Sequence, residues 1–129
     1  MVLIDTSVFI NYFKGIDSPG VRHLDGLADG AFCVTPIVSQ ELLQGARDDK
    51  EFQTLKSYLR TQLFCYPLDP VITHEYAAKI FMEARKHGIT IRSSIDCLIA
   101  QIAIENKIPL LHDDRDFDAI ESISSLRIF

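Results

Sequence analysis

The stretch "SIDCLIAQIAIENKIPLLHDD" (94–114) decides the fold class, because it joins a helical pattern to a strand pattern. A helix over 95–106 is predicted by apolar residues that recur at helical spacing, at Ile95, Leu98, Ile99 and Ile102. The following "PLLH" (109–112) is a short apolar run, typical of a strand that is covered on both faces. A helix that leads directly into a strand must run antiparallel to it. The helix therefore begins near the carboxyl end of this strand.

The remaining sequence continues the alternation of strands and helices. Short apolar runs predict further strands over 2–4, 32–34, 63–66 and 126–129. Helical patterns occupy 6–14, 19–28, 36–46, 49–62, 70–87 and 115–121. This order predicts an α/β fold in which a mostly parallel sheet has helices on both faces, and a single domain over 1–129. Ligands of such sheets bind beyond the carboxyl ends of the strands, so candidate site residues are sought there.

Composition narrows the class of protein. Hydrophobic residues make up 47% of the 129 residues and charged residues 24%, which is ordinary for a globular domain. The net charge of -5 gives no general attraction to a polyanion, so an RNA or DNA partner would need local basic residues or metal ions. Three cysteines without a CxxC pair favour a reducing compartment. We expect a cytoplasmic protein, since neither a signal peptide nor an apolar run of ~20 residues is present.

Acidic residues stand at several positions that this fold sends to the carboxyl edge. Asp5 follows the first predicted strand, although it could simply cap the next helix. Glu41 borders the apolar stripe of helix 36–46, where an unpaired carboxylate is costly unless its tip reaches water. Asp96 lies in the first turn of helix 95–106, a position that the helix dipole alone would favour.

The acid-rich "DDRDFD" (113–118) begins where strand 109–112 ends. We expect Asp114 and Asp116 to turn inward, and Asp113 and Asp118 to face water or cap the following helix. Two carboxylates ~5 Å apart repel by about 3 kcal/mol at an effective dielectric near 20, so a gathering of acids needs water, protons or cations. Mg²⁺ and Mn²⁺ prefer oxygen ligands, whereas zinc is disfavoured because no His/Cys cluster has ligand spacing. Metal-assisted phosphodiester hydrolysis fits this pattern best.

Three segments in this order resemble the PIN-domain ribonucleases, and most closely the VapC-type toxins of toxin–antitoxin pairs. They are "VLIDTSVFINYF" (2–13), "PIVSQELLQGAR" (36–47) and "IRSSIDCLIAQIAIENKIPLLHDDRDFDAI" (91–120). The resemblance implies a three-layer α/β/α sandwich with a five-stranded parallel sheet. It also implies an endoribonuclease that depends on Mg²⁺ or Mn²⁺, a cognate antitoxin and a homodimer.

Carried over residue by residue, the acidic quartet of the family falls on Asp5, Glu41, Asp96 and Asp114. Asp116 matches a further acid that assists the metals, and Thr6 or Ser7 matches the hydroxyl after the first aspartate. His112 departs from the family, which commonly has Thr or Ser there, and it could hydrogen-bond a site carboxylate or a phosphate with a charge that varies with pH.

Partner surfaces and rival functions complete the predictions. Arg92 and Arg115 are the best candidate RNA phosphate contacts, since they flank Asp96 and Asp114 in sequence. An antitoxin segment would lie on helices 36–46 and 49–62, with apolar anchors at Leu43, Phe52, Leu55 and Leu59. A non-catalytic interaction module on the same fold is the main alternative. A HAD-like phosphatase is weaker, because Ser7 stands where its second aspartate should be.

Overall fold

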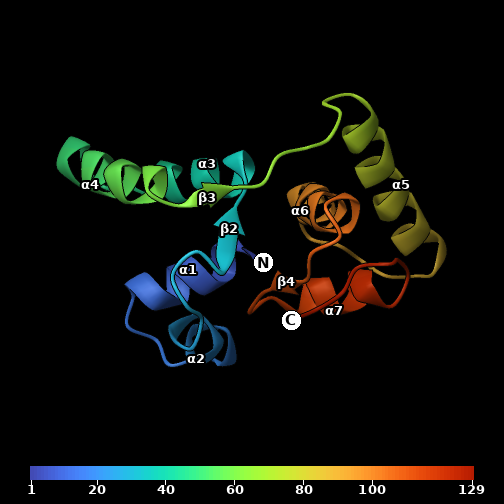
Figure 1. Ribbon diagram of the computed structural model, residues 1–129. Helices are drawn as coiled ribbons and strands as arrows, with labels where there is room; N and C mark the ends of the chain where they lie inside the picture. Colours follow the sequence, from blue (N-terminus) through green and yellow to red (C-terminus); the bar gives the residue numbers. More distant parts are fainter.

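The computed structural model describes residues 1–129 and contains seven helices around a four-stranded parallel sheet (Figure 1). The strands are β1 (Val2–Ile4), β2 (Phe32–Val34), β3 (Leu63–Phe64) and β4 (Leu110–Leu111). The helices are α1 (Thr6–Phe13), α2 (Pro19–Asp25), α3 (Pro36–Gln44), α4 (Asp49–Arg60), α5 (Ile72–Lys86), α6 (Ser94–Glu105) and α7 (Arg115–Glu121). The predicted α/β class and the alternation of elements are confirmed.

The strand order is β3-β2-β1-β4, and every pair of neighbours is parallel. The chain therefore moves from β1 through β2 to β3 in one direction, and β4 is added on the other side of β1. The order reverses between β1 and β4, where Leu3 pairs with Leu110. In open α/β sheets this reversal marks the crevice in which ligands bind.

The fifth strand expected at 126–129 is reduced to one bridge between Leu110 and Ile128. Leu110 donates its N–H to the carbonyl of Arg127, and its own carbonyl accepts from Phe129, both at 2.9 Å. Since β4 extends over only two residues, this segment has little more than Leu110 to pair with. The sheet is therefore four-stranded, with an additional edge contact.

The helices cover both faces of the sheet. In Figure 1, α5, α6 and α7 lie on the opposite side of the strands from α1 to α4. β1 and β4 are buried along their whole length, and Phe9 and Phe117 fill the core with no exposed surface. Burial of each large apolar side chain stabilises the fold by about 2 kcal/mol. None of the helices has the length and apolarity needed to cross a lipid bilayer.

Several helices are shorter than predicted, and α5 is one of them. This helix begins at Ile72 rather than at residue 70, and the Asp69 carboxylate caps the turn that leads into it by accepting the N–H groups of Val71 and Ile72 at 2.9 and 2.8 Å. At its other end Gly88 adopts φ 71°, a left-handed conformation that glycine allows without strain and that stops the helix.

Candidate active site

Three carboxylates meet at the carboxyl edge of the sheet. One oxygen each of Asp96, Asp114 and Asp116 lies within 4.8 Å of the others, a spacing that would let them share one cation. Asp96 belongs to the first turn of α6, and Asp116 to the first turn of α7. Asp114 follows β4 and caps α7 by accepting the Asp116 N–H at 3.0 Å. α6 therefore begins beside the carboxyl end of β4, as its run into this strand predicts.

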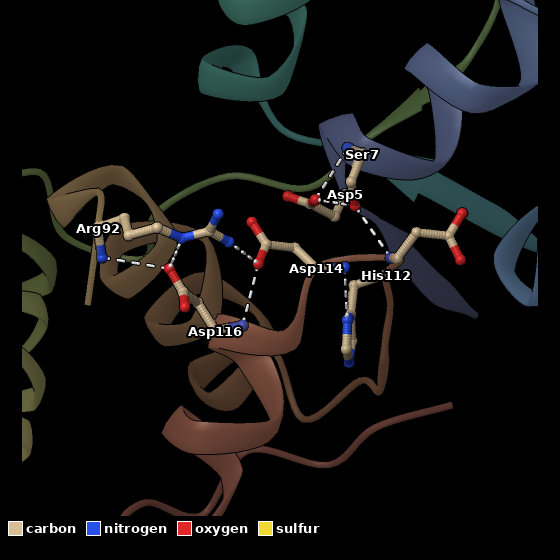
Figure 2. A network of polar contacts seen from close by, with 7 residues as sticks. Asp5, Ser7, Arg92, His112, Asp114 and Asp116 are labelled. Atoms are coloured by element: carbon tan, nitrogen blue, oxygen red, sulfur yellow. Dashed lines mark hydrogen bonds and ion pairs between the residues drawn. The ribbon is translucent and has the colours of Figure 1, made fainter. Parts of the chain in front are cut away.

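Asp5 reaches the same edge from β1. Its carboxylate accepts the backbone N–H of Ser7 at 2.9 Å and also the Ser7 hydroxyl, so it caps α1 (Figure 2). The side chain is almost fully buried, and this burial raises the pKa of Asp5 even though the Ser7 hydrogen bonds act against the rise. Asp5 therefore caps α1, as the alternative interpretation expected, and also lies at the carboxyl edge with the other acids.

Glu41 extends from α3 toward the start of α1. The Thr6 hydroxyl donates to Glu41 Oε2, which connects residues 35 positions apart. Thr35 fixes the start of α3 by accepting the Val38 N–H at 3.2 Å. Glu41 is half-buried, in agreement with its expected position at the margin of the apolar stripe.

The pKa of Asp96 indicates that all these acids lie close together. Burial, and after it the charges of Asp5, Asp114, Asp116 and Glu41 in that order, together raise the pKa of Asp96 to about 7. Four acids from three other parts of the chain thus lie close enough to oppose ionisation of a fifth. Such a cluster keeps a proton near neutral pH unless a cation compensates the negative charge.

Arg92 is the one basic residue that forms ion pairs within this cluster. Its Nη2 donates to Asp114 Oδ1 at 2.7 Å, and its Nε donates to Asp116 Oδ2 at 3.0 Å (Figure 2). The Arg92 backbone N–H reaches the same Asp116 oxygen at 3.2 Å. This residue, expected as a phosphate contact, is therefore engaged by two of the site acids.

Comparison with known proteins gives the family. The PIN domain model matches residues 2–123. Ribonuclease VapC11 of Mycobacterium tuberculosis is 37% identical over 130 residues, which cover 98% of this chain and 96% of the relative. The chain belongs to the VapC ribonucleases of the PIN-domain family.

Solved structures agree with this fold. The VapBC2 structure of Rickettsia felis, bound to a promoter DNA fragment, matches with a TM-score of 0.75 at 18% identity and covers 100% of this chain and 98% of that one. A toxin–antitoxin complex of Klebsiella pneumoniae matches with a TM-score of 0.68 at 17% identity, over 89% and 88% of the two chains. Membership of the VapC ribonucleases leaves no reason to retain the HAD-like phosphatase.

His112, the departure from the usual VapC pattern, turns away from the acid cluster (Figure 2). Its Nδ1 accepts the Asp114 N–H at 3.1 Å, and its ring packs 5.2 Å from the Phe117 ring. Nε2 lies 3.4 Å from a carboxylate oxygen of Asp118, an exposed residue outside the cluster. The possible hydrogen bond to a site carboxylate is therefore not formed, because this rotamer directs Nε2 toward Asp118, and a contact with an RNA phosphate stays a prediction.

Asp113 was expected to face water or cap a helix, and that prediction is wrong. Its carboxylate accepts hydrogen bonds from Asn11 Nδ2 at 3.0 Å, from the Ser18 hydroxyl and from the Gly20 N–H at 2.8 Å. Burial acts to raise its pKa, but these three hydrogen bonds outweigh it and lower the pKa of Asp113. The donors lie 93 to 102 positions earlier in the chain, so no local pattern could have indicated them.

Arg115 lies beside the cluster without joining it. The side chain is exposed and forms no ion pair. It lines a shallow pocket of about 460 Å³ in front of the acids, together with Ser7, Ile10, Asn11, Arg92, Asp113 and Asp114. Arg115 is therefore placed to meet a molecule that approaches from solvent.

Proposed function

We propose that this VapC-family ribonuclease cleaves RNA with a divalent cation, Mg²⁺ or Mn²⁺, held by Asp5, Glu41, Asp96, Asp114 and Asp116. One observation carries the proposal, namely the Asp96 carboxyl group, which is surrounded by four other acids and has its pKa raised to about 7. A divalent cation bound there would offset the repulsion between the carboxylates, and groups with such perturbed pKa values are typical of functional sites.

The donor set fits the proposed ion. All five side chains offer carboxylate oxygens, which Mg²⁺ and Mn²⁺ prefer, and the three that lie within sharing distance, Asp96, Asp114 and Asp116, are joined there by no histidine or cysteine. When bound, such an ion activates a water and stabilises the negative charge that develops on the phosphate. Thr6 and Ser7 restrain two of these acids, since their hydroxyls donate to Glu41 and Asp5.

Binding of RNA by a chain of net charge -5 requires local positive charge. Arg115 is exposed and free of ion pairs at the rim of the site, so it is the stronger candidate for a phosphate contact. Arg92 shares this rim, but its guanidinium already satisfies two carboxylates.

RNA cleavage by purified protein in the presence of Mn²⁺ tests the proposal. Asp5→Asn and Asp96→Asn should each lose at least 100-fold in cleavage rate, about the size expected when a ligand to a charged centre is lost. Asp25→Asn serves as the control, because Asp25 is exposed at the end of α2 and is not one of the acids that raise the pKa of Asp96. Equal cleavage by the wild type and both site variants would assign the activity to another site, and would favour the non-catalytic interaction module.

We also propose an antitoxin partner, since several similar structures are toxin–antitoxin complexes. A groove of about 540 Å³ between α1, α3 and α4 leads away from Glu41. Its lining combines apolar and charged side chains: Ile10, Phe13, Lys14, Glu41, Leu42, Arg47, Glu51 and Leu55. An amphipathic segment laid in this groove would cover the access to Glu41.

The four anchors expected for this partner do not form one surface. Leu55 lines the groove, whereas Leu43 and Phe52 line a separate pocket with Phe64. Leu59 is 1% exposed and belongs to the core, so it cannot contact a partner. The spacing of apolar residues on α4 could not separate its core-facing residues from its groove-facing ones.

The homodimer and the cytoplasmic location stay predictions, and light scattering of the purified protein tests the homodimer.

A further inference from the structure

Arg92 forms several hydrogen bonds to the carboxylates on one side of the acid cluster. Two guanidinium nitrogens and the backbone N–H of this residue engage Asp114 and Asp116, at distances between 2.7 and 3.2 Å. The guanidinium keeps its positive charge at every physiological pH and offers a planar fork of donors. Arg92 therefore places a permanent cation against two of the five acids.

In each of these two carboxylates, one oxygen accepts hydrogen bonds and the other accepts none. Asp114 Oδ1 accepts from Arg92 Nη2 and from the Asp116 N–H. Asp116 Oδ2 accepts from Arg92 Nε and from the Arg92 N–H. Asp114 Oδ2 and Asp116 Oδ1 have no hydrogen-bond partner within the chain, and neither does the Asp96 carboxylate.

We propose that Arg92 takes the position that a second divalent ion would need, so that the cluster binds one ion and uses Arg92 as its other positive charge. This inference rests on the proposed function. Two-metal sites place their ions ~3.5–4 Å apart, with carboxylates shared between them. Here Asp114 Oδ1 and Asp116 Oδ2 already accept from the guanidinium, so the oxygens left for a metal ion are Asp114 Oδ2, Asp116 Oδ1 and those of Asp96.

The charge of Arg92 has a second consequence. A guanidinium bound to the same carboxylates repels a divalent ion across a short distance, so it lowers the affinity of the site for that ion. If Arg92 instead served only to position the two carboxylates, its removal would weaken metal binding. The two roles thus predict changes of opposite sign.

The test is titration of the purified protein with Mn²⁺, followed by calorimetry and by electron paramagnetic resonance of free Mn²⁺. Wild type should bind one ion per chain. Arg92→Gln should bind the first ion about tenfold more tightly, or bind a second ion, because the neutral amide frees carboxylate oxygens and removes repulsion. Arg92→Lys, which retains the charge, should keep a stoichiometry of one.

Arg115→Gln is the matched control for the loss of one positive charge near the cluster without loss of an ion pair. An equal gain of affinity in Arg115→Gln would overturn the proposal in favour of a general charge effect. Weaker Mn²⁺ binding by a folded Arg92→Gln protein would overturn it in favour of positioning. Two ions in a wild type that cleaves RNA would overturn only the role of Arg92, whereas RNA cleavage without any bound ion would overturn the proposed function as well.

Discussion

The backbone N–H of Gly20 donates to Asp113 Oδ1 at 2.8 Å, which ties the start of α2 to the residue that follows β4. A methyl group on Gly20 would lie 2.6 Å from this oxygen. The Asp113 carboxylate also accepts hydrogen bonds from Asn11 and Ser18. The backbone N–H of Asp113 donates to the Ser7 hydroxyl, which in turn donates to Asp5. A network of hydrogen bonds therefore connects the α1–α2 segment to Asp5, through the carboxylate and the backbone N–H of Asp113.

Gly20→Ala should destabilise the protein by about 1–3 kcal/mol, because the methyl group forces Asp113 away from a buried hydrogen-bond donor. Urea unfolding followed by circular dichroism measures the change. Gly26→Ala is the matched control, since a methyl group there meets its nearest atom at an ordinary 3.5 Å. Equal free energies of unfolding for the two variants would contradict a structural role for the Gly20–Asp113 contact.

Ser7→Ala should reduce RNA cleavage more than it reduces stability. The Ser7 hydroxyl donates to Asp5 and accepts from the Asp113 N–H at 3.0 Å, so its loss removes an orienting contact from the site. Removal of a hydrogen bond that lowers the pKa of Asp5 should raise this pKa further, which moves the pH profile of cleavage upward. An unchanged pH profile in a folded Ser7→Ala protein would show that the hydroxyl does not act on Asp5.

Leu59 and Phe52, both on α4, should respond differently to truncation. Leu59 is 1% exposed, so Leu59→Ala should cost about 2–5 kcal/mol through lost burial and a cavity. Phe52 is 37% exposed, and Phe52→Ala should cost less than half as much in unfolding free energy. Thermal unfolding of the two variants measures this difference, and similar losses would mean that Phe52 is also part of the core.

The parallel sheet and the convergence of Asp5, Asp96 and Asp114 could be predicted from sequence, because connectivity alone fixes which strand and helix ends meet at one edge. The rotamer of His112 and the role of Asp113 could not. Both depend on side-chain contacts, and the partners of Asp113 are distant in the chain. The prediction of a fifth strand was wrong for a related reason, since the pairing of that strand depended on the length of β4, which is a property of another segment.

The metal-free protein should lose stability as pH rises toward 8. Asp96 has a folded-state pKa of about 7 against 3.8 in a model peptide, so the folded state holds its proton more tightly than the unfolded state does. The stabilising effect of protonation is complete below the unfolded pKa and is lost as pH rises through about 7. Between pH 5 and 8 the loss is on the order of 3 kcal/mol. Thermal unfolding in chelator should show it, and the neutral side chain of Asp96→Asn should remove most of the slope.

Binding of Mn²⁺ should show the opposite dependence on pH. The ion requires the Asp96 carboxylate, whereas the pKa of about 7 leaves this group mostly protonated at pH 6 and mostly ionised at pH 8. Metal and proton therefore compete, and the apparent Kd for Mn²⁺ should weaken about tenfold from pH 8 to pH 6. Calorimetry in two buffers of different ionisation enthalpy would also detect the released proton at pH 6. A Kd that stays constant over this range, without proton release, would mean that Asp96 does not bind the ion and that the other four acids hold it without Asp96.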